Sequence, residues 1–152
     1  MDKRVVITGL GAITPIGKNV EENWNSIKEK KCGIDEITLF NTENFKTKLA
    51  AEVKEYNPLE HFEAKQAKRL DRYSQFAIIA AREAVKSSEI SKENTDFNRV
   101  GIFVSSGIGG LTTIQEQCRI DNEKGNKRVS PMFIPMSIAN MPAGNVAIEL
   151  GA

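Results

Sequence analysis

Residues 100–110 constrain the fold of this chain more than any other stretch. The run at 100–104 (VGIFV) is rich in β-branched and aromatic residues that do not alternate with polar ones. This pattern predicts a strand buried on both faces, in the middle of a mostly parallel sheet. Two serines and three glycines follow, interrupted by the apolar Ile108. We therefore expect a sharp turn at the carboxyl end of a central strand, where open α/β sheets build ligand sites, and Ile108 is the first residue expected to touch a ligand.

A second buried strand is predicted within residues 4–10 (RVVITGL), entering a loop punctuated by glycines, and it is the expected sheet neighbour of residues 100–105. Residues 34–56 are predicted to be loop with one small β-element. Helices are predicted from Asn19 to Gly33, briefly after Asn57, from Asp71 to about Ser87, from Leu111 to about Lys124, and from Asn140 to Gly151. This order favours an α/β fold, with a mostly parallel central sheet covered by helices.

Length and composition exclude several classes of protein. The chain has 152 residues, of which 40% are hydrophobic and 27% charged, as is typical of one soluble globular domain without a membrane span. With 21 basic and 20 acidic residues, it offers no overall electrostatic attraction for nucleic acid or a membrane. The N-terminus lacks a signal-peptide core, and Cys32 and Cys118 lack the spacing of a metal site. We therefore expect a cytoplasmic protein with reduced thiols, no metal and no cofactor.

The sequence contains no credible catalytic set. Cys118 lies on an apolar helical stripe and is expected to be a buried small hydrophobe. His61 is the only histidine and stands in a charged context, so it is expected at the surface. A ligand-like strand edge without catalytic residues indicates either a binding module or a piece of a larger enzyme.

The glycines at 9 and 11 invite comparison with a dinucleotide-binding fingerprint. The third glycine of that fingerprint is replaced by Thr14, and Pro15 stands where the helix should already be running. A tight structural turn is the better interpretation, because a partial match is weak.

Three stretches, in the right order, resemble the β-ketoacyl-acyl-carrier-protein synthases, the condensing enzymes of fatty-acid and polyketide synthesis. They are residues 5–17 (VVITGLGAITPIG), the turn at 105–110 (SSGIGG), and residues 130–135 (SPMFIP) together with Asn140. The turn is most similar to that of the type II elongating enzymes. The resemblance implies a thiolase-like fold, a homodimer, and a decarboxylative Claisen condensation between an acyl thioester and malonyl-acyl-carrier protein.

In that family a cysteine takes the acyl group from the carrier protein and two histidines assist decarboxylation. These three residues come after the helix that ends here at Gly151. The resemblance therefore implies that residues 1–152 are the incomplete N-terminal part of one ketoacyl-synthase domain. We expect this chain alone to lack condensing activity, and to leave an unpaired strand edge and exposed apolar surface.

The resemblance also implies an acyl pocket. Gly107 and Ile108 would lie at the channel for the acyl chain, and Phe133 and Ile134 would close the pocket from the partner subunit. Without the resemblance, plain core packing would be favoured for the three apolar residues.

Four basic residues at 65, 68, 69 and 72 would share one face if this segment were helical, and such a face is usually just solvated. A further basic pair stands at 127 and 128, beside a glycine turn. Five of these residues match family positions that meet the acidic carrier protein. The resemblance implies a carrier-protein-binding role for Lys65, Lys68, Arg69, Lys127 and Arg128.

Two alternatives from other classes stay open. One is a non-catalytic dimerisation subunit of a polyketide synthase, and the other is a nucleotide-binding α/β module that uses the glycines at 9–11.

Overall fold

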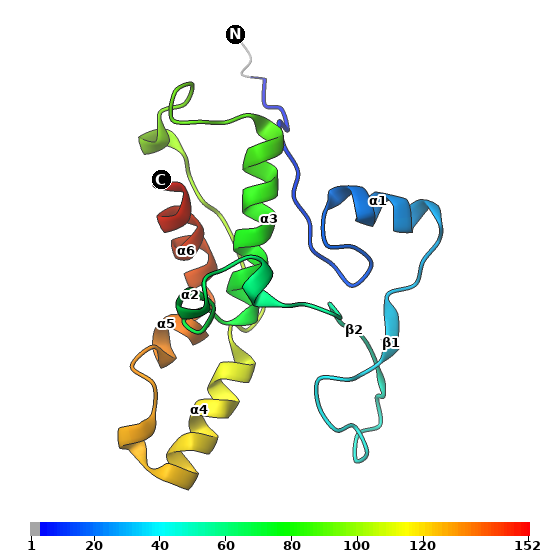
Figure 1. Ribbon diagram of the computed structural model, residues 1–152, viewed down its shortest axis with the longest axis vertical. Coiled ribbons are helices and arrows are strands. Elements are labelled where there is room, and N and C mark those ends of the chain that lie inside the picture. The colour runs from blue at the N-terminus through cyan, green and yellow to red at the C-terminus, as the bar shows by residue number, and fades with distance from the viewer. Residues whose placement is uncertain (1–3) are drawn as a thin grey trace. The chain divides into compact units, whose positions relative to one another are not determined.

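The computed structural model describes residues 4–152 and divides into two compact units (Figure 1). The first unit contains the chain up to Tyr56 together with Arg82–Glu89, and the second contains Asn57–Ala81 and Ile90–Ala152. The longest helix, α3 (Arg72–Ser88), contributes its first part to the second unit and its last part to the first.

The first unit contains the only strands of residues 4–152, β1 (Ile34–Glu36) and β2 (Leu49–Ala51). They pair antiparallel, with Ile34 opposite Ala51 and Glu36 opposite Leu49. The small β-element predicted within residues 34–56 is therefore confirmed.

Helix α1 (Val20–Lys28) begins as the sequence predicts and ends earlier. The Asn19 side chain accepts a hydrogen bond from the backbone N–H of Glu22 at 2.8 Å, which caps the helix. The helix stops five residues before Gly33, because Lys30 takes a left-handed conformation with φ of 57°.

The helical spacing of Val20, Trp24 and Ile27 predicts that α1 buries an apolar face, and this prediction is wrong, because the buried face is polar. Trp24 is 60% exposed and Ile27 56% exposed, whereas Asn23 and Ser26 are buried. The Asn23 amide donates to the carbonyls of Gly17 and Asn19 at 3.0 and 2.7 Å. Directional hydrogen bonds therefore hold this helix to the preceding loop.

The prediction of a mostly parallel central sheet is wrong for residues 4–152. Residues 5–9 and 100–105 form no strand, and Val5, Ile7 and Phe103 are 92%, 83% and 96% exposed. A strand buried on both faces requires a hydrogen-bonded neighbour on each side and a covering layer on each face. Between residues 4 and 152 neither segment has such a neighbour, so neither can form a ladder.

The second unit has an apolar core and contains α2 (Ala64–Ala67), α4 (Leu111–Lys124), α5 (Phe133–Ser137) and α6 (Met141–Leu150). Helix α4 packs against α5, and α5 against α6. Gly151 ends α6 in a left-handed conformation with φ of 70°, as predicted for a helix stop. Short 3₁₀ turns occur at Pro58–Glu60, Phe97–Arg99 and Asn126–Arg128. The buried apolar residues are Phe62, Ala67, Ile78, Ile79 and Val146.

None of the helices between residues 4 and 152 is long and apolar enough to cross a membrane. Within the same range, no group of three or more histidine, cysteine, aspartate or glutamate residues could hold a metal ion.

Candidate functional site

The glycine turn at 107–110 has a fixed base and an open tip. The backbone N–H of Gly110 donates to the carbonyl of Ser137 at 2.9 Å. Gly109 has a φ of +91°, and a Cβ there would lie 2.2 Å from the same carbonyl oxygen, so only glycine fits. At the tip, Ile108 is 67% exposed and Gly107 has nothing within 4 Å of where a Cβ would stand. The turn is therefore anchored at Gly109 and Gly110, while Ile108 is displayed.

Two side chains from the start of α3 support this base. The buried carboxylate of Asp71 accepts a hydrogen bond from the Thr113 hydroxyl at 2.5 Å, in the first turn of α4. The Tyr73 hydroxyl donates to the carbonyl of Ile138 at 2.7 Å. Burial raises the pKa of Tyr73, which keeps the proton that it donates. Sequence reasoning identified Asp71 only as a helix cap, which it also is, since it accepts from the Tyr73 N–H at 3.3 Å.

The four predicted acyl-pocket residues do not line one cavity within residues 4–152. Phe133 lines a cavity of about 300 Å³ together with residues of α4 and the following turn. Ile108 does not line that cavity, and Ile134 on α5 is 57% exposed. The side chains of Ile108 and Ile134 are therefore exposed, and no single cavity encloses them with Phe133.

The basic residues at 65–72 do not form one helical face, which corrects the prediction. Helix α2 ends at Ala67, Lys68 is its C-cap, and α3 begins at Arg72. Lys65 and Arg69 nevertheless line one groove of about 570 Å³. Apolar side chains line the same groove, namely Leu70, Ile78, Met132 and Ile148. Glu63 and Glu149 line the groove as well, so Lys65 and Arg69 share the rim of an apolar floor with two carboxylates.

A buried glutamine holds residues 65–72 in this broken form. The Gln75 amide donates to the carbonyls of Ala67 and Leu70, at 3.0 Å each. The Ala67 carbonyl at the end of α2 also accepts the Leu70 N–H at 3.4 Å, and the bond to Leu70 gives a partner to a carbonyl between α2 and α3.

The second basic pair lies on the 3₁₀ turn Asn126–Arg128, where Lys127 and Arg128 are both exposed. Arg128 lines a hollow of about 580 Å³ with Lys124 and Ile120. Sequence reasoning missed Lys124, although its place in the last turn of α4, directly before Gly125, marks it as a neighbour of the pair. The two basic groups do not share either cavity.

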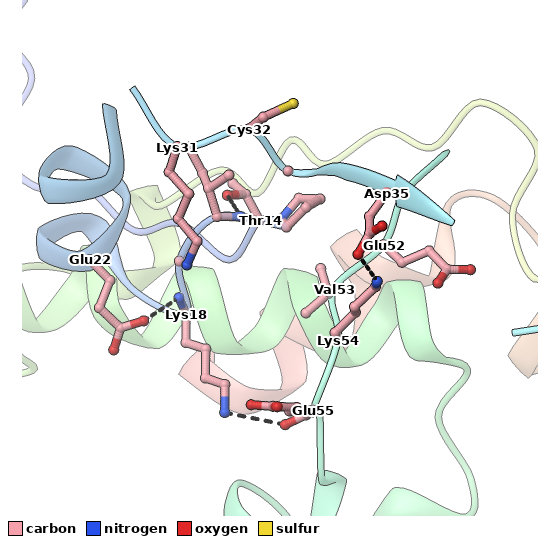
Figure 2. A pocket seen from close by; sticks show the side chains of 14 residues that line it. Thr14, Lys18, Glu22, Lys31, Cys32, Asp35, Glu52, Val53, Lys54 and Glu55 are labelled. Carbon is pink, nitrogen blue, oxygen red and sulfur yellow. Dashed lines mark hydrogen bonds and ion pairs between the residues drawn. The ribbon is translucent and has the colours of Figure 1, made fainter. Parts of the chain in front are cut away.

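A further cavity, of about 320 Å³, lies in the first unit (Figure 2). Figure 2 shows Lys54 extending to Asp35, which it contacts at 2.6 Å, and this contact lowers the pKa of Asp35. Lys18 donates to the carbonyl of Glu55 at 3.2 Å. Acidic and basic side chains are mixed along its walls, so the cavity favours no single charge of ligand.

Residues that could serve as a nucleophile or base do not assemble. Cys32 and Cys118 are both exposed. The prediction that Cys118 is buried is therefore wrong. Thr113, on another part of the circumference of α4, is the residue that this helix buries. His61 is half-buried rather than exposed, beside Phe62 with 6.4 Å between ring centroids.

The glycines near the N-terminus serve packing. A Cβ on Gly9 would lie 2.2 Å from the carbonyl oxygen of Ala84. The N–H of Leu10 donates to Ser87 and that of Ala12 to Glu83, both at 2.9 Å. These N–H groups bind side chains of α3, so they are not offered to a phosphate, and the loop agrees with a structural turn.

The chain is similar throughout its length to one family of condensing enzymes. The model for the β-ketoacyl synthase N-terminal domain matches residues 2–152. The 3-oxoacyl-[acyl-carrier-protein] synthase 2 of Staphylococcus aureus is 44% identical over 151 residues, covering 99% of this chain and 36% of the relative. The protein of the same name from Synechocystis is 40% identical over 150 residues, covering 99% of this chain and 36% of the relative. The chain thus spans about a third of the length of these relatives.

Solved structures agree on the fold. A chain from the complex of a type II polyketide acyl-carrier protein with its ketosynthase has a TM-score of 0.79 at 23% identity, covering 99% of this chain and 39% of that one. The ishigamide ketosynthase/chain length factor has a TM-score of 0.77 at 26% identity, covering 95% and 36%. The expected thiolase-like fold class is therefore confirmed, although its central sheet is not formed by residues 4–152.

Proposed function

Because this chain belongs to the β-ketoacyl synthase family, we propose that it is the N-terminal portion of a 3-oxoacyl-[acyl-carrier-protein] synthase of fatty-acid elongation. The observation that carries this proposal is 44% identity over 99% of the chain to a protein of that name, against 23–26% identity to polyketide ketosynthase chains. The reaction would be decarboxylative Claisen condensation of an acyl thioester with malonyl-acyl-carrier protein, in a cytoplasmic homodimer.

In this proposal residues 1–152 belong to a single domain whose catalytic cysteine and histidines lie in the remainder of the synthase. A condensation of this kind needs a polarisable nucleophile to hold the acyl group and a dry channel for its tail. The exposure of Val5, Ile7 and Phe103 supports the idea that further strands of the synthase cover these side chains. The purified 152-residue chain should then show no malonyl-carrier-protein decarboxylation.

The acyl channel is assigned to Gly107, Ile108, Phe133 and Ile134. Ile108 is displayed at the tip of a turn whose base is fixed, which suits a side chain that meets the acyl tail. In the complete synthase, Ile108→Phe should reduce the use of long acyl donors while sparing short ones. Overpacking a close-packed channel costs about 1–3 kcal/mol, which is roughly a five- to hundredfold loss of kcat/KM. Equal losses for all donor lengths would contradict this role.

Docking of the carrier protein is assigned to Lys65, Lys68, Arg69, Lys127 and Arg128. All five are exposed, and two of them border a groove with an apolar floor. An acidic protein would be steered to this surface by charge, which acts chiefly on the association rate.

The test compares Lys65→Glu combined with Arg69→Glu against wild type in the complete synthase, with an acyl-carrier-protein donor and an acyl-CoA surrogate. The carrier-borne donor should lose kcat/KM, most strongly at low salt, where the Debye length is longest. The surrogate should change little, because it reaches the pocket without docking an acidic protein. Lys28→Glu combined with Lys86→Glu, both exposed in the first unit, is the control with the same change of charge. Equal losses for both donors would refute the assignment.

A second candidate is a non-catalytic dimerisation partner in a polyketide synthase, which the similarity to the ketosynthase/chain length factor favours. Sequencing the parent polypeptide beyond Ala152 discriminates between the two. A cysteine followed by two histidines indicates an enzyme, and their replacement indicates the non-catalytic partner.

A further inference from the structure

The segment Asp71–Tyr73 contacts the glycine turn directly through Asp71 and indirectly through Tyr73. Asp71 Oδ2 would lie only 2.7 Å from a Cβ on Gly110, so its carboxylate stands directly against the base of the turn. The same carboxylate accepts the Thr113 hydroxyl, three residues further along. Tyr73 binds the carbonyl of Ile138, next to Ser137, whose carbonyl accepts the N–H of Gly110.

Three hydrogen bonds, joined by short stretches of backbone, connect the start of α3 with the base of the turn. One arm runs from Asp71 through Thr113 into α4, directly after the glycines. The other runs from Tyr73 to Ile138 and through Ser137 back to Gly110. Asp71 and Thr113 are each 9% exposed, so their bond lies where water competes little for either group. Charge-assisted bonds of this kind are among the stronger ones that hold a backbone in place.

We infer that Asp71 and Tyr73 are positioning residues that set where the turn displays Ile108, and thereby the acyl-chain length that the pocket accepts. This inference rests on the proposed function of the turn. Asp71 and Tyr73 need not touch the acyl chain, because they act through Thr113 and the backbone of Ile138. If the hydrogen bonds that hold Gly109 and Gly110 were lost, the backbone would be free to shift at Gly107, which has open space around it.

The test is made on Thr113 in the complete synthase, because valine keeps the shape of threonine and removes its hydroxyl. Thr113→Val should change the ratio of kcat/KM for long against short acyl donors by about tenfold, within the range by which supporting residues modulate a distant site. Thr113→Ser keeps the donor and should restore the ratio. Tyr73→Phe, which removes only a hydroxyl, should shift the ratio in the same direction and provides the measurement if Thr113→Val does not fold.

Ile79→Val is the control for stability, since Ile79 is a core residue of the same unit and has no bond to the turn. It should lower the melting temperature and leave the donor-length ratio unchanged. A wild-type synthase without condensing activity would overturn the proposed function and this inference with it. An active wild type whose donor-length ratio is unaffected by Thr113→Val, or is not restored by Thr113→Ser, would overturn only the positioning role.

Discussion

The first unit buries Asn23, Ser26 and Glu52, whereas the second buries Ile78 and Val146, each only 2% exposed. In the first unit, buried side chains are held by hydrogen bonds to specific backbone groups, such as the two N–H groups of residues 38 and 39 that bind Glu52. The second unit also buries hydrogen-bonded groups, such as Asp71 and Gln75, but within residues 4–152 it alone adds buried apolar side chains, whose removal from water contributes to its stability.

The two units should therefore respond differently to substitutions of their buried residues. Apolar packing is non-directional and tolerates shape-conserving substitutions, whereas a buried polar group whose partner is removed costs its full desolvation. The first unit also leaves Val5, Ile7 and Trp24 largely exposed. Its apolar residues therefore contribute little to its own stability, and its fold depends on a few polar contacts.

The largest effect is expected in the apolar interior. Ile78→Ala should lower the free energy of unfolding of the second unit by about 2–5 kcal/mol, because it removes buried apolar atoms and leaves a cavity. Ile148→Ala is the matched control on the same unit. Ile148 is 79% exposed, and its loss should change stability by less than about 0.5 kcal/mol. Hydrogen exchange of peptides from each unit would measure both variants, and similar effects of the two would contradict the apolar core.

The next effect is expected in the polar interior of the first unit. Asn23→Leu removes the donors to Gly17 and Asn19 and the acceptor for Thr14, and should cost about 1–3 kcal/mol. Asn25→Leu, on the exposed face of the same helix, is the control with the same gain in helix propensity. Hydrogen exchange localises the loss. If Asn25→Leu destabilised α1 as much as Asn23→Leu does, the polar interior would be irrelevant to stability.

Acid should weaken the first unit through Glu52. The hydrogen bond from the backbone N–H of Thr38 is the main cause that lowers the pKa of Glu52 from its ordinary value of 4.5. Its contribution to stability is present above pH 4.5 and is lost as the pH falls through the lowered folded pKa.

Glu52→Gln should flatten this acid dependence, and melting curves between pH 3 and pH 6, about the ordinary carboxylate range, would measure it. Asp35, whose pKa is lowered by Lys54, should leave a smaller residual dependence. Glu21→Gln at the exposed start of α1 is the control. An unchanged slope in Glu52→Gln would contradict the role of Glu52.

Several helix boundaries could be predicted from local signals, but Gly33 does not mark the end of α1, because Lys30 leaves the helical conformation first. Asn19 caps α1, and Gly151 ends α6. Asp71 caps α3 by accepting the Tyr73 N–H, and a cap there is incompatible with one helix through residues 65–72, because a cap residue interrupts helical backbone. The prediction of one basic face over residues 65–72 is therefore wrong, and Asp71 is the residue in the sequence that argues against it.

Strands and the support of the site could not be predicted in the same way, because they depend on distant partners. The apolar runs at 5–9 and 100–105 indicate burial, but a strand forms only where another strand supplies the ladder. Asp71 and Thr113 are 42 residues apart, and no local pattern pairs them. The glycines at 109 and 110, by contrast, do mark the close backbone approach that the structure contains.

The smallest effects should differ in sign between the two units for the same substitution. Ser74 in the second unit is 1% exposed, and its hydroxyl makes no hydrogen bond of normal geometry within residues 4–152, so it bears a desolvation cost without compensation. Ser74→Ala should leave stability unchanged or raise it by up to about 1 kcal/mol, because alanine also has the higher helix propensity. Ser26 in the first unit is 8% exposed and donates to the carbonyl of Ile16 at 2.6 Å.

Ser26→Ala should therefore destabilise the first unit by about 1 kcal/mol, less its own gain in helix propensity. Urea denaturation of both variants, with hydrogen exchange to assign each change to its unit, provides the comparison. Both serines lie inside α-helices, so the propensity gain is common to the two and cancels in the difference. A loss for Ser74→Ala as large as that for Ser26→Ala would mean that the Ser74 hydroxyl has a partner. The Ser74 hydroxyl would then stabilise the second unit as the Ser26 hydroxyl stabilises the first, and the expected difference in sign between the two substitutions would not be found.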